Sequence, residues 1–363
     1  MIEKIELVNF KCFENVEVPL RQVNVLAGIN GMGKSTVIQS LLLLRQSYLA
    51  DGGKKGLYLN GPYVNLGNGQ DLLYEKPLND EIGIAVQEYG KNCSFSFGYR
   101  PEEDVQPIEK GQDKIDEKLS VFGNQFVYLS AYRIKPQELY GITNDQDLKN
   151  REFDRTGEYA FQYLSQYGSE DVRNHAVIIS DKLGISLANQ VRMWMDMISP
   201  GVSPLIKVDH QLRKSEVRYE YIEGRNKTNS YKSVNVGFGI TYVLPIVISL
   251  LSAKEGDLII LENPEAHIHP RGQRKLGELI AASGSRNAQI ILETHSDHIL
   301  NGIRLAVKNG KISAEETNLL YFYKDSDDFK HKVKNPKMRS DGRISEWPDG
   351  FLDEWDNALM ELL

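Results

Sequence analysis

The chain contains 363 residues, of which 41% are hydrophobic and 26% are charged, and its formal net charge at pH 7 is −7. This composition is ordinary for one large or two modest globular domains, and the negative charge excludes a global basic field for nucleic acid. The two cysteines, Cys12 and Cys93, exclude a disulfide framework. With no signal-peptide pattern and no run of 18 apolar residues, we expect a cytoplasmic protein without membrane association.

The first 50 residues predict strands that lead into a helix. Residues 2–10 alternate between apolar and polar as a strand does, and residues 16–20 and 22–27 are predicted as two further strands. A glycine-rich loop follows, and a long apolar run then predicts a helix over residues 34–48. The glycine loop therefore lies between a strand and a helix.

The middle of the chain changes character twice. Residues 57–130 are predicted to be β-rich, with short strands at 81–87, 93–99 and 125–129, while the charged interval 101–118 is predicted to be a solvated loop. Residues 130–201 become helical, with candidate helices at 158–167, 171–183 and 187–198. Alternating residues on both sides of a turn at 224–226 then predict a β-hairpin.

The last third alternates between helices and buried strands. An apolar run at 240–251 predicts a helix, and strands at 257–261 and 288–292 flank a helix at 271–282. A further helix follows residue 296. This alternation predicts a parallel sheet covered by helices. We therefore expect a core split between residues 1–55 and 230–325, an inserted β-rich and helical section at 56–229, and a tail at 326–363 that packs on the core.

The glycine loop carries the strongest chemical signal. Gly28, Gly33, Lys34 and Ser35 fit the pattern G-x-x-x-x-G-K-[ST], in which backbone N–H groups and the start of the following helix bind phosphate. Glycines at 28, 31 and 33 allow those N–H groups to turn inward. Lys34 would contact the β- and γ-phosphates, and the Ser35 hydroxyl would bind Mg²⁺. The alternative is a glycine-rich turn without a ligand.

An acidic residue ends the strand predicted at 257–261. Glu262 stands where a carboxylate would meet Mg²⁺ and the phosphates, which is the arrangement of a Walker B motif. Asn263 then stands where a glutamate would polarise the attacking water, and an amide can orient a water but cannot take its proton. Glu265 is the candidate substitute. The alternative is helix-capping chemistry around Pro264.

Two further motifs would act on the same nucleotide. His295 follows the last buried strand, at the sheet edge where ligands bind, and is a candidate sensor of the γ-phosphate. Asn235, Gly237 and Gly239 precede a long helix and would form a second phosphate-facing turn, which could serve the nucleotide of a partner. The alternatives are a structural histidine and an ordinary helix start.

A histidine-rich set suggests a metal-dependent nuclease as another alternative. It consists of His267, His269, His295 and His298 together with Glu262 and Glu265. The spacing fits no zinc pattern, since H-E-x-x-H is absent.

Taken together, the motifs resemble those of one family of ATPases. The segments LVNFKCFENVEV, GINGMGKST, NVGFGITYVLPIV, LIILENPEAHIHP and ETHSDHIL resemble the ABC-type ATPase heads of the RecF/SMC/OLD-like AAA group. They are similar to predicted bacterial ATPases with an ENPEAHLHP-type Walker B and a WPDGF-like tail, here residues 347–351. The middle contributes only YLSAYRIKP (128–136) and RTGEY (155–159). The resemblance implies an α/β P-loop NTPase of ABC-ATPase-head type, with a central mostly parallel sheet, an antiparallel β-subdomain and a helical insertion.

The resemblance also implies roles for individual residues. ATP would be the ligand, Mg²⁺ would lie on Ser35 and Glu262, and His295 would be the switch histidine. Residues 235–239 would take the place of the ABC signature, although no LSGGQ is present. Gln70 and Lys11 would be the Q-loop glutamine and a basic residue near the nucleotide. The phosphate-binding residues would be Asn30, Gly31, Gly33, Lys34, Ser35 and Thr36.

The implied function is a slow ATPase that acts as a homodimeric switch with two shared ATP sites. Asn263 predicts the slow hydrolysis. Because only about 40 residues follow the last core strand, no Toprim nuclease domain is expected. The switch would act on DNA or on a separate effector such as a nuclease, in DNA repair or antiphage defence, by family analogy. An ATP-gated scaffold with negligible hydrolysis is the alternative. Basic stretches at 213–232 and 324–343 are the candidates for DNA contact.

Overall fold

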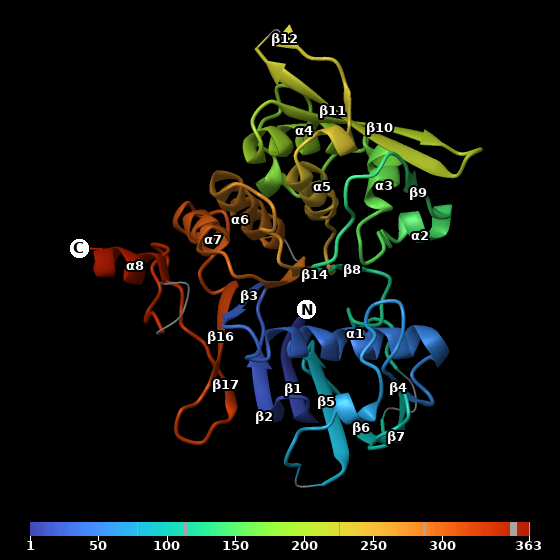
Figure 1. Cartoon of the computed structure of the whole chain (residues 1–363), viewed down its shortest axis with the longest axis vertical. Helices are drawn as coiled ribbons and strands as arrows, with labels where there is room; N and C mark the ends of the chain where they lie inside the picture. The colour runs from blue at the N-terminus through green and yellow to red at the C-terminus, as the bar shows by residue number, and fades with distance from the viewer. Residues whose placement is uncertain (78, 112–114, 225, 286–287, 349–353, 363) are drawn as a thin grey trace. The chain divides into compact units, whose positions relative to one another are not determined.

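The computed structural model describes residues 1–77, 79–111, 115–224, 226–285, 288–348 and 354–362, and the side chains of 354–357 are excluded. Residues 349–351 of the WPDGF-like segment and Arg225 of the predicted hairpin turn lie outside the described residues. The chain forms two compact units (Figure 1). The first contains Met1–Asn124, Thr317–Met338 and Ile344–Leu363, and the second contains Gln125–Glu316 and Arg339–Arg343. This division differs from the expected core and insertion, which stay a prediction.

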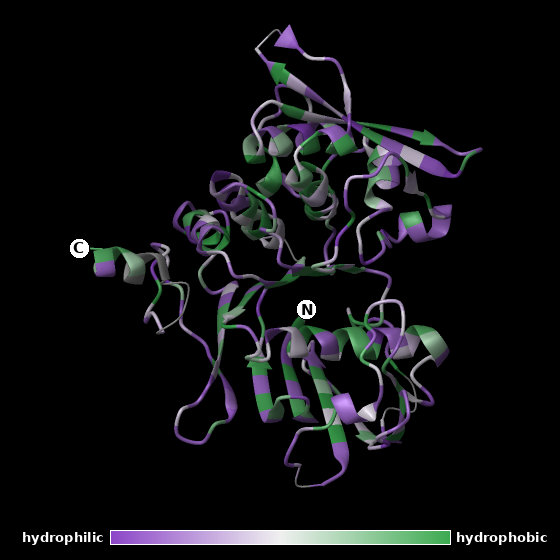
Figure 2. Cartoon of the chain, viewed as in Figure 1, coloured by the Kyte–Doolittle hydropathy of each residue, from purple (hydrophilic) through white to green (hydrophobic). Residues whose placement is uncertain are grey.

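The first unit contains an antiparallel sheet and a strand-loop-helix segment. The sheet has the order β2 (Phe13–Pro19), β1 (Ile2–Phe10), β5 (Glu81–Glu88), β6 (Lys91–Gly98), β7 (Val105–Lys110) and β4 (Gly56–Tyr58). Its strands alternate between buried apolar and exposed polar residues, which appear as bands in Figure 2. Separately, β3 (Val23–Gly28) pairs in parallel with β16 (Thr317–Lys324), which pairs with β17 (His331–Lys334) in the antiparallel sense.

Helix α1 (Lys34–Asp51) follows the glycine loop directly, as predicted. It is buried over most of its surface, because its run of leucines gives it an apolar side in almost every direction. It ends at Gly52, whose left-handed φ of 76° lets its N–H donate to the Tyr48 carbonyl. The terminus therefore follows from a glycine at the C-cap position.

The second unit holds three parallel strands, β8 (Phe126–Leu129), β14 (Leu258–Glu262) and β15 (Gln289–Glu293). Helices α5 (Phe238–Leu251), α6 (Pro270–Gly284) and α7 (Asp297–Lys308) belong to the same unit. Helices α6 and α7 pack closely at Gly277, where a Cβ would overlap the Ile299 backbone. These strands and helices match the predicted alternation, with boundaries shifted by at most two residues.

The rest of the second unit is a smaller sheet with short helices. Strands β10 (Val202–Asp209) and β11 (Lys214–Glu223) form a hairpin. Strand β11 also pairs with β9 (Tyr140–Gly141), β12 (Asn226–Lys227) and β13 (Tyr231–Lys232). Helices α2 (Asp145–Lys149), α3 (Ala160–Tyr167) and α4 (Leu187–Ile198) complete the unit, and α8 (Glu354–Leu362) ends the described chain. No helix among the described residues is both long enough and apolar enough to span a membrane.

Two predictions of secondary structure were wrong. The helix expected at 171–183 is absent: Asp171 bridges to Ser186, and the Asn174 side chain donates to the carbonyls of Ala282 and Ser283. Only the short turn His175–Val177 is helical there, because hydrogen bonds to distant residues hold the backbone in a non-helical conformation. The loop expected at 101–118 contains β7, which forms because β6 and β4 supply backbone partners on its two sides.

Candidate functional site

The phosphate-binding loop has the backbone conformation that its glycines predict. Gly28, Gly31 and Gly33 have φ angles of 141°, 80° and 103°, which other residues rarely adopt. A Cβ at Gly33 would overlap the Phe13 ring, whereas a Cβ at Gly31 would meet nothing within 4 Å. Close packing therefore requires a glycine at position 33, and backbone conformation alone favours one at position 31.

Lys34 is buried and its ammonium group lies against the loop. The Nζ atom donates to the carbonyl oxygens of Gly28 at 2.8 Å and Ile29 at 2.9 Å. The N-cap residue of α1 is Gly33, which has no side chain to accept from the first turn, and no acidic residue occupies that turn. A positively charged side chain and a helix N-terminus without a carboxylate both favour an anion, so they fit the triphosphate of ATP. The ATP prediction therefore fits the residues of this loop.

The other residues predicted for this half of the site lie on two neighbouring segments. Lys11, with φ of 53°, donates through Nζ to Gln39 of α1 at 2.8 Å, and its N–H donates to the Leu72 carbonyl at 2.7 Å. Burial lowers the pKa of Lys11. Gln70 is exposed on the short turn Gly69–Asp71, close in sequence to Leu72. Lys11 and the Gln70 segment thus lie together beside α1.

Two residues that sequence reasoning did not select also contact the loop. The His331 ring on β17 is hydrogen-bonded to the backbone of Gly31 and Cys12. Burial lowers the pKa of the ring, and these two hydrogen bonds oppose the change. The Cys12 thiol lies 3.7 Å from the Thr36 hydroxyl. No local motif marks His331, because 300 residues of chain separate it from Gly31.

The second unit holds the acidic half of the predicted site. Glu262 ends β14, and its Oε2 atom accepts from the Ala131 N–H at 3.0 Å. The Glu262 carboxylate is also hydrogen-bonded to the Tyr128 hydroxyl. Burial raises the pKa of Glu262, and these hydrogen bonds oppose the rise. Burial and the neighbouring Glu262 raise the pKa of Tyr128 in turn, so its hydroxyl stays protonated and donates to the carboxylate.

Asn263 adopts a conformation that explains an amide at this position. Its φ is 43°, in the left-handed region that asparagine tolerates better than glutamate. Its N–H donates to the Glu293 carbonyl at 2.8 Å, while its buried Oδ1 atom has no partner among the described residues. An amide oxygen without a hydrogen-bond partner, next to a carboxylate, could bind Mg²⁺ or a water molecule coordinated to Mg²⁺, since Mg²⁺ prefers oxygen ligands. The Mg²⁺ prediction therefore fits Glu262 and its neighbour.

Glu265 is occupied by the segment that contains His295. Its Oε2 atom accepts from the Thr294 hydroxyl and its Oε1 atom from the His295 N–H, both at 2.8 Å. The two turns that follow β14 and β15 are thereby joined, and the exposed His295 lies at this junction. Both carboxylate oxygens of Glu265 accept hydrogen bonds from this segment. This arrangement fits a role in positioning His295 better than a role in activating a water.

The NVGFG segment packs against the turn that follows β14. Asn235 ends the turn Ser233–Asn235, and α5 starts after Gly237. A Cβ at Gly239 would overlap the His267 carbonyl, whereas a Cβ at Gly237 would come no closer than 3.9 Å to Ile240. Asn235, Gly237 and Phe238 are exposed. The structure therefore brings this segment together with the Glu262 turn and leaves its tip open.

The histidines do not form a metal centre. Nowhere in the part of the chain that the structure describes do three or more His, Cys, Asp or Glu side chains gather to hold a metal ion. His269 instead caps α6, accepting from the Arg271 N–H, and the His267 ring packs 4.5 Å from that of Phe238. The metal-nuclease alternative loses its structural basis.

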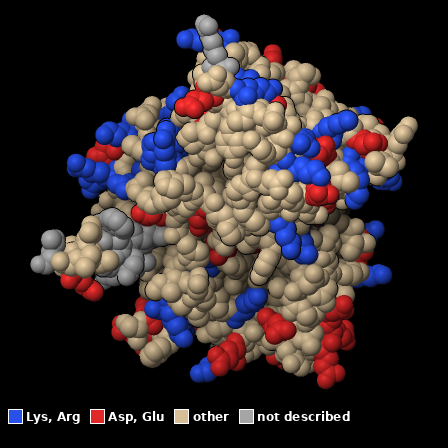
Figure 3. Space-filling model, turned by 45° about the horizontal axis from the view of Figure 1, so that its top comes forward, with Lys and Arg blue, Asp and Glu red and all other residues tan. Residues whose placement is uncertain are grey.

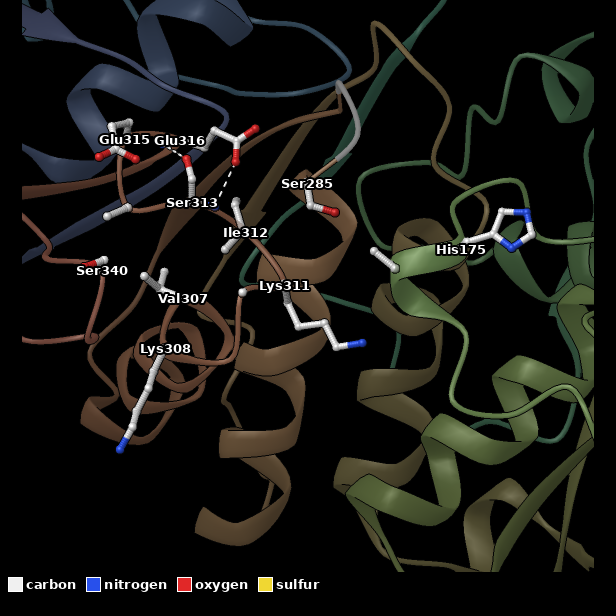
Figure 4. A pocket seen from close by; sticks show the side chains of 13 residues that line it. His175, Ser285, Val307, Lys308, Lys311, Ile312, Ser313, Glu315, Glu316 and Ser340 are labelled. Atoms are coloured by element: carbon white, nitrogen blue, oxygen red, sulfur yellow. Dashed lines mark hydrogen bonds between the residues drawn. The ribbon is translucent and has the colours of Figure 1, made fainter.

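A cavity of about 760 Å³ lies elsewhere in the second unit (Figure 4). Residues of both charges line it, among them His175, Lys308, Lys311, Glu315 and Glu316. Lys308, Lys311 and Glu315 are exposed. None of the predicted site residues lines this cavity, so it is not the nucleotide site.

Three family models match separate parts of the chain. The model described as "AAA ATPase domain" matches residues 1–176, and "AAA domain, putative AbiEii toxin, Type IV TA system" matches residues 203–301. "Protein of unknown function (DUF3696)" matches residues 312–362. The first model includes the glycine loop and the second includes Glu262 and His295.

Similar proteins are found among curated sequences and solved structures. The endonuclease GajA of Bacillus cereus (strain HuB5-5) is 23% identical over 322 residues, which cover 79% of this chain and 44% of that protein. The chain therefore spans less than half the length of this relative. An SMC head bound to the C-winged helix domain of ScpA has a TM-score of 0.58 at 13% identity, covering 93% of this chain and 98% of that one. An SMC head with an extended coiled coil from Pyrococcus furiosus has a TM-score of 0.55 at 14% identity, covering 99% of both chains.

Proposed function

We propose that the chain is an ABC-type ATPase head of the RecF/SMC/OLD-like group, with the α/β P-loop fold predicted from its sequence. In this proposal it is a slow ATPase that works as a homodimeric switch. The conformation of the loop around Lys34 carries this proposal, because a buried ammonium group and left-handed glycines at a helix start suit a triphosphate. Mg²⁺, held by Ser35 and Glu262, would neutralise phosphate charge.

Slow turnover follows from the two candidate bases. Asn263 cannot accept a proton, and Glu265 accepts hydrogen bonds from Thr294 and His295. We expect phosphate release by the wild type to exceed that of Lys34→Ala, and Asn263→Asp to increase it, because aspartate tolerates the left-handed φ of residue 263. Wild-type release no faster than that of Lys34→Ala would leave the ATP-gated scaffold as the function.

The exposed tip of the NVGFG segment supports shared sites. Asn235 and Gly237 would form a phosphate-facing turn in a chain that already has its own phosphate loop, so a second copy would supply the nucleotide that they contact. In such a dimer ATP joins the copies and hydrolysis releases them.

A mixing experiment tests whether the sites are shared. Lys34→Ala damages the phosphate loop, and Asn235→Asp places a negative charge on the exposed signature-like turn. In a 1:1 mixture about half of the dimers would contain one copy of each variant, and each such dimer would have one intact site out of two. About a quarter of the wild-type ATPase activity should therefore return. Activity that stays at the level of the separate variants would show that each chain works alone.

The output of the switch would be DNA engagement or control of a separate effector such as a nuclease, in DNA repair or antiphage defence. A relative named as an endonuclease supports this setting, as does the toxin–antitoxin wording of one family model. Co-expression of the chain with its genomic neighbour should reduce phage plaques, and the Lys34→Ala variant should not. Equal plaque numbers with both would argue against an ATP-dependent role in defence.

A further inference from the structure

Arg133 is a buried cation that lies beside the acidic half-site. It follows β8 in the YLSAYRIKP segment, and only 5% of its surface is exposed. Its Nη1 atom donates to the carbonyls of Ser130 at 2.8 Å and Glu262 at 2.6 Å, and its Nη2 atom donates to the Asn263 carbonyl at 2.7 Å. A single guanidinium therefore joins the end of β8 to the two residues at the Walker B position.

The same guanidinium also contacts α5. Its Cζ atom lies 4.1 Å from the centroid of the Tyr242 ring, and the Tyr242 hydroxyl donates to the Ala131 carbonyl. Ala131 in turn donates its N–H to the Glu262 carboxylate at 3.0 Å. The Tyr242 ring also packs edge-on against His267, 5.4 Å between centroids. Arg133 thus lies where the start of α5 meets the turn after β14.

The turn that Arg133 holds needs outside support. Asn263 and His267 have φ angles of 43° and 64°, and residues other than glycine adopt such angles only when neighbouring contacts stabilise them. Arg133 binds the carbonyl of Asn263, and Glu293 accepts from its N–H. Lysine could not replace this pattern, because one ammonium group lacks the planar fork that reaches both carbonyls.

We infer that Arg133 is a positioning residue, which holds the Glu262-Asn263 turn and joins it to the signature-like start of α5 so that the two move together. The functional consequence rests on the proposed function: a phosphate bound at residues 235–239 would change the position of Glu262. The coupling itself is a property of the folded chain.

Hydrogen exchange of the full-length chain tests the coupling without any turnover. Arg133→Lys should increase amide exchange at least about tenfold in two separated segments, residues 236–244 and 260–268, because both lose their common support. Helix α7 should exchange at the wild-type rate. Tyr242→Phe, which removes only the bond to Ala131, should give a smaller increase in the same two segments. Arg192→Lys on the exposed side of α4 is the matched control and should change neither.

Nucleotide assays show whether the position matters for the chemistry. Arg133→Lys should lower kcat at least about tenfold and raise the Mg²⁺ concentration for half-maximal activity, with KM for ATP within about twofold, because misplacing Glu262 affects the reacting geometry more than phosphate binding. Wild-type exchange in either segment would overturn the inference, as would an unchanged kcat in an active enzyme. A wild type no faster than Lys34→Ala would refute the proposed ATPase instead, and the exchange data would still decide the coupling.

Discussion

At the scale of single residues, buried charges carry the largest consequences. Arg151 and Asp257 form an ion pair in which both side chains are almost completely buried. Asp257 is the residue directly before β14. Arg151 also donates to the Ser252 carbonyl at 3.1 Å. A buried pair adds little net stability over an apolar replacement, but removal of one partner leaves the other charge without compensation.

We therefore expect Arg151→Met to lower the free energy of unfolding by about 3–5 kcal/mol, measured by urea denaturation. The double variant Arg151→Met/Asp257→Leu should recover most of this loss, because it removes the stranded carboxylate as well. Lys149→Met, on an exposed residue of α2, is the control and should stay within about 0.5 kcal/mol of the wild type. A single variant as stable as this control would show that the pair is not important for stability.

Cys93 on β6 makes stability depend on pH in the alkaline range. Burial raises the pKa of its thiol to about 11. The folded protein therefore binds this proton more tightly than the unfolded chain does, so the stabilisation is complete below pH 9 and is lost as pH rises towards 11. One pH unit is worth about 1.4 kcal/mol for one proton, which limits the loss to about 2.7 kcal/mol.

The free energy of unfolding should fall more steeply between pH 9 and pH 11 in the wild type than in Cys93→Ala. The difference between the two proteins isolates Cys93 from the lysines and tyrosines that titrate in the same range. Cys12→Ala provides a second comparison at the other cysteine. Parallel curves for the wild type and Cys93→Ala would contradict the raised pKa.

At the scale of elements, the packing of α5 against the turn after β14 decides the shape of the acidic half-site. The two glycines of the NVGFG segment have different reasons to be glycine. Gly239 lies directly against the His267 backbone, which cannot move aside as a flexible side chain could, whereas Gly237 has ordinary space around it. Only the glycine at position 239 is required for packing.

Gly239→Ala should therefore destabilise the fold by about 1–3 kcal/mol, which is typical of overpacking, and should lower the thermal midpoint. Gly237→Ala is the matched control two residues away and should leave the midpoint within about 2 °C. If both variants melt at the wild-type temperature, α5 does not pack on the turn as described.

At the scale of the whole molecule, charge distribution bears on DNA as a partner. Figure 3 shows Lys and Arg interspersed with Asp and Glu on the face in view. Within the basic stretch 213–232, Arg218 pairs with Glu216, Lys227 with Glu220 and Lys232 with Glu138. Local carboxylates thus offset much of the charge that the sequence suggested for phosphate contacts.

We expect the double-logarithmic plot of DNA affinity against salt to have a slope no steeper than about −3, measured by fluorescence anisotropy between 50 and 200 mM KCl. The variant Glu216→Gln/Glu220→Gln would release Arg218 and Lys227, and should steepen the slope by about one for each new phosphate contact. A wild-type slope near −6 or beyond would identify a basic surface that these pairs do not neutralise.

The sequence by itself determined the features that depend on neighbouring residues. The strand, glycine loop and helix around Lys34 follow from local patterning and backbone freedom, as does the strand that ends at Glu262. The same holds for the order of helices and strands between residues 238 and 308, whereas β16 and β17 were not predicted. Family motifs then identified the type of fold, and structural similarity to SMC heads confirms it.

Only the tertiary structure decided which distant residues support those motifs. Arg133, Tyr128 and Tyr242 reach the Glu262 turn from other elements, and His331 reaches Gly31 across 300 residues. The missing helix at 171–183 has the same origin, since Asn174 is bound by the end of α6. Local patterns specify backbone preferences within a few residues, whereas buried polar groups take whichever partners the packed chain brings to them. Long-range contacts of this kind leave no periodic signal in one sequence.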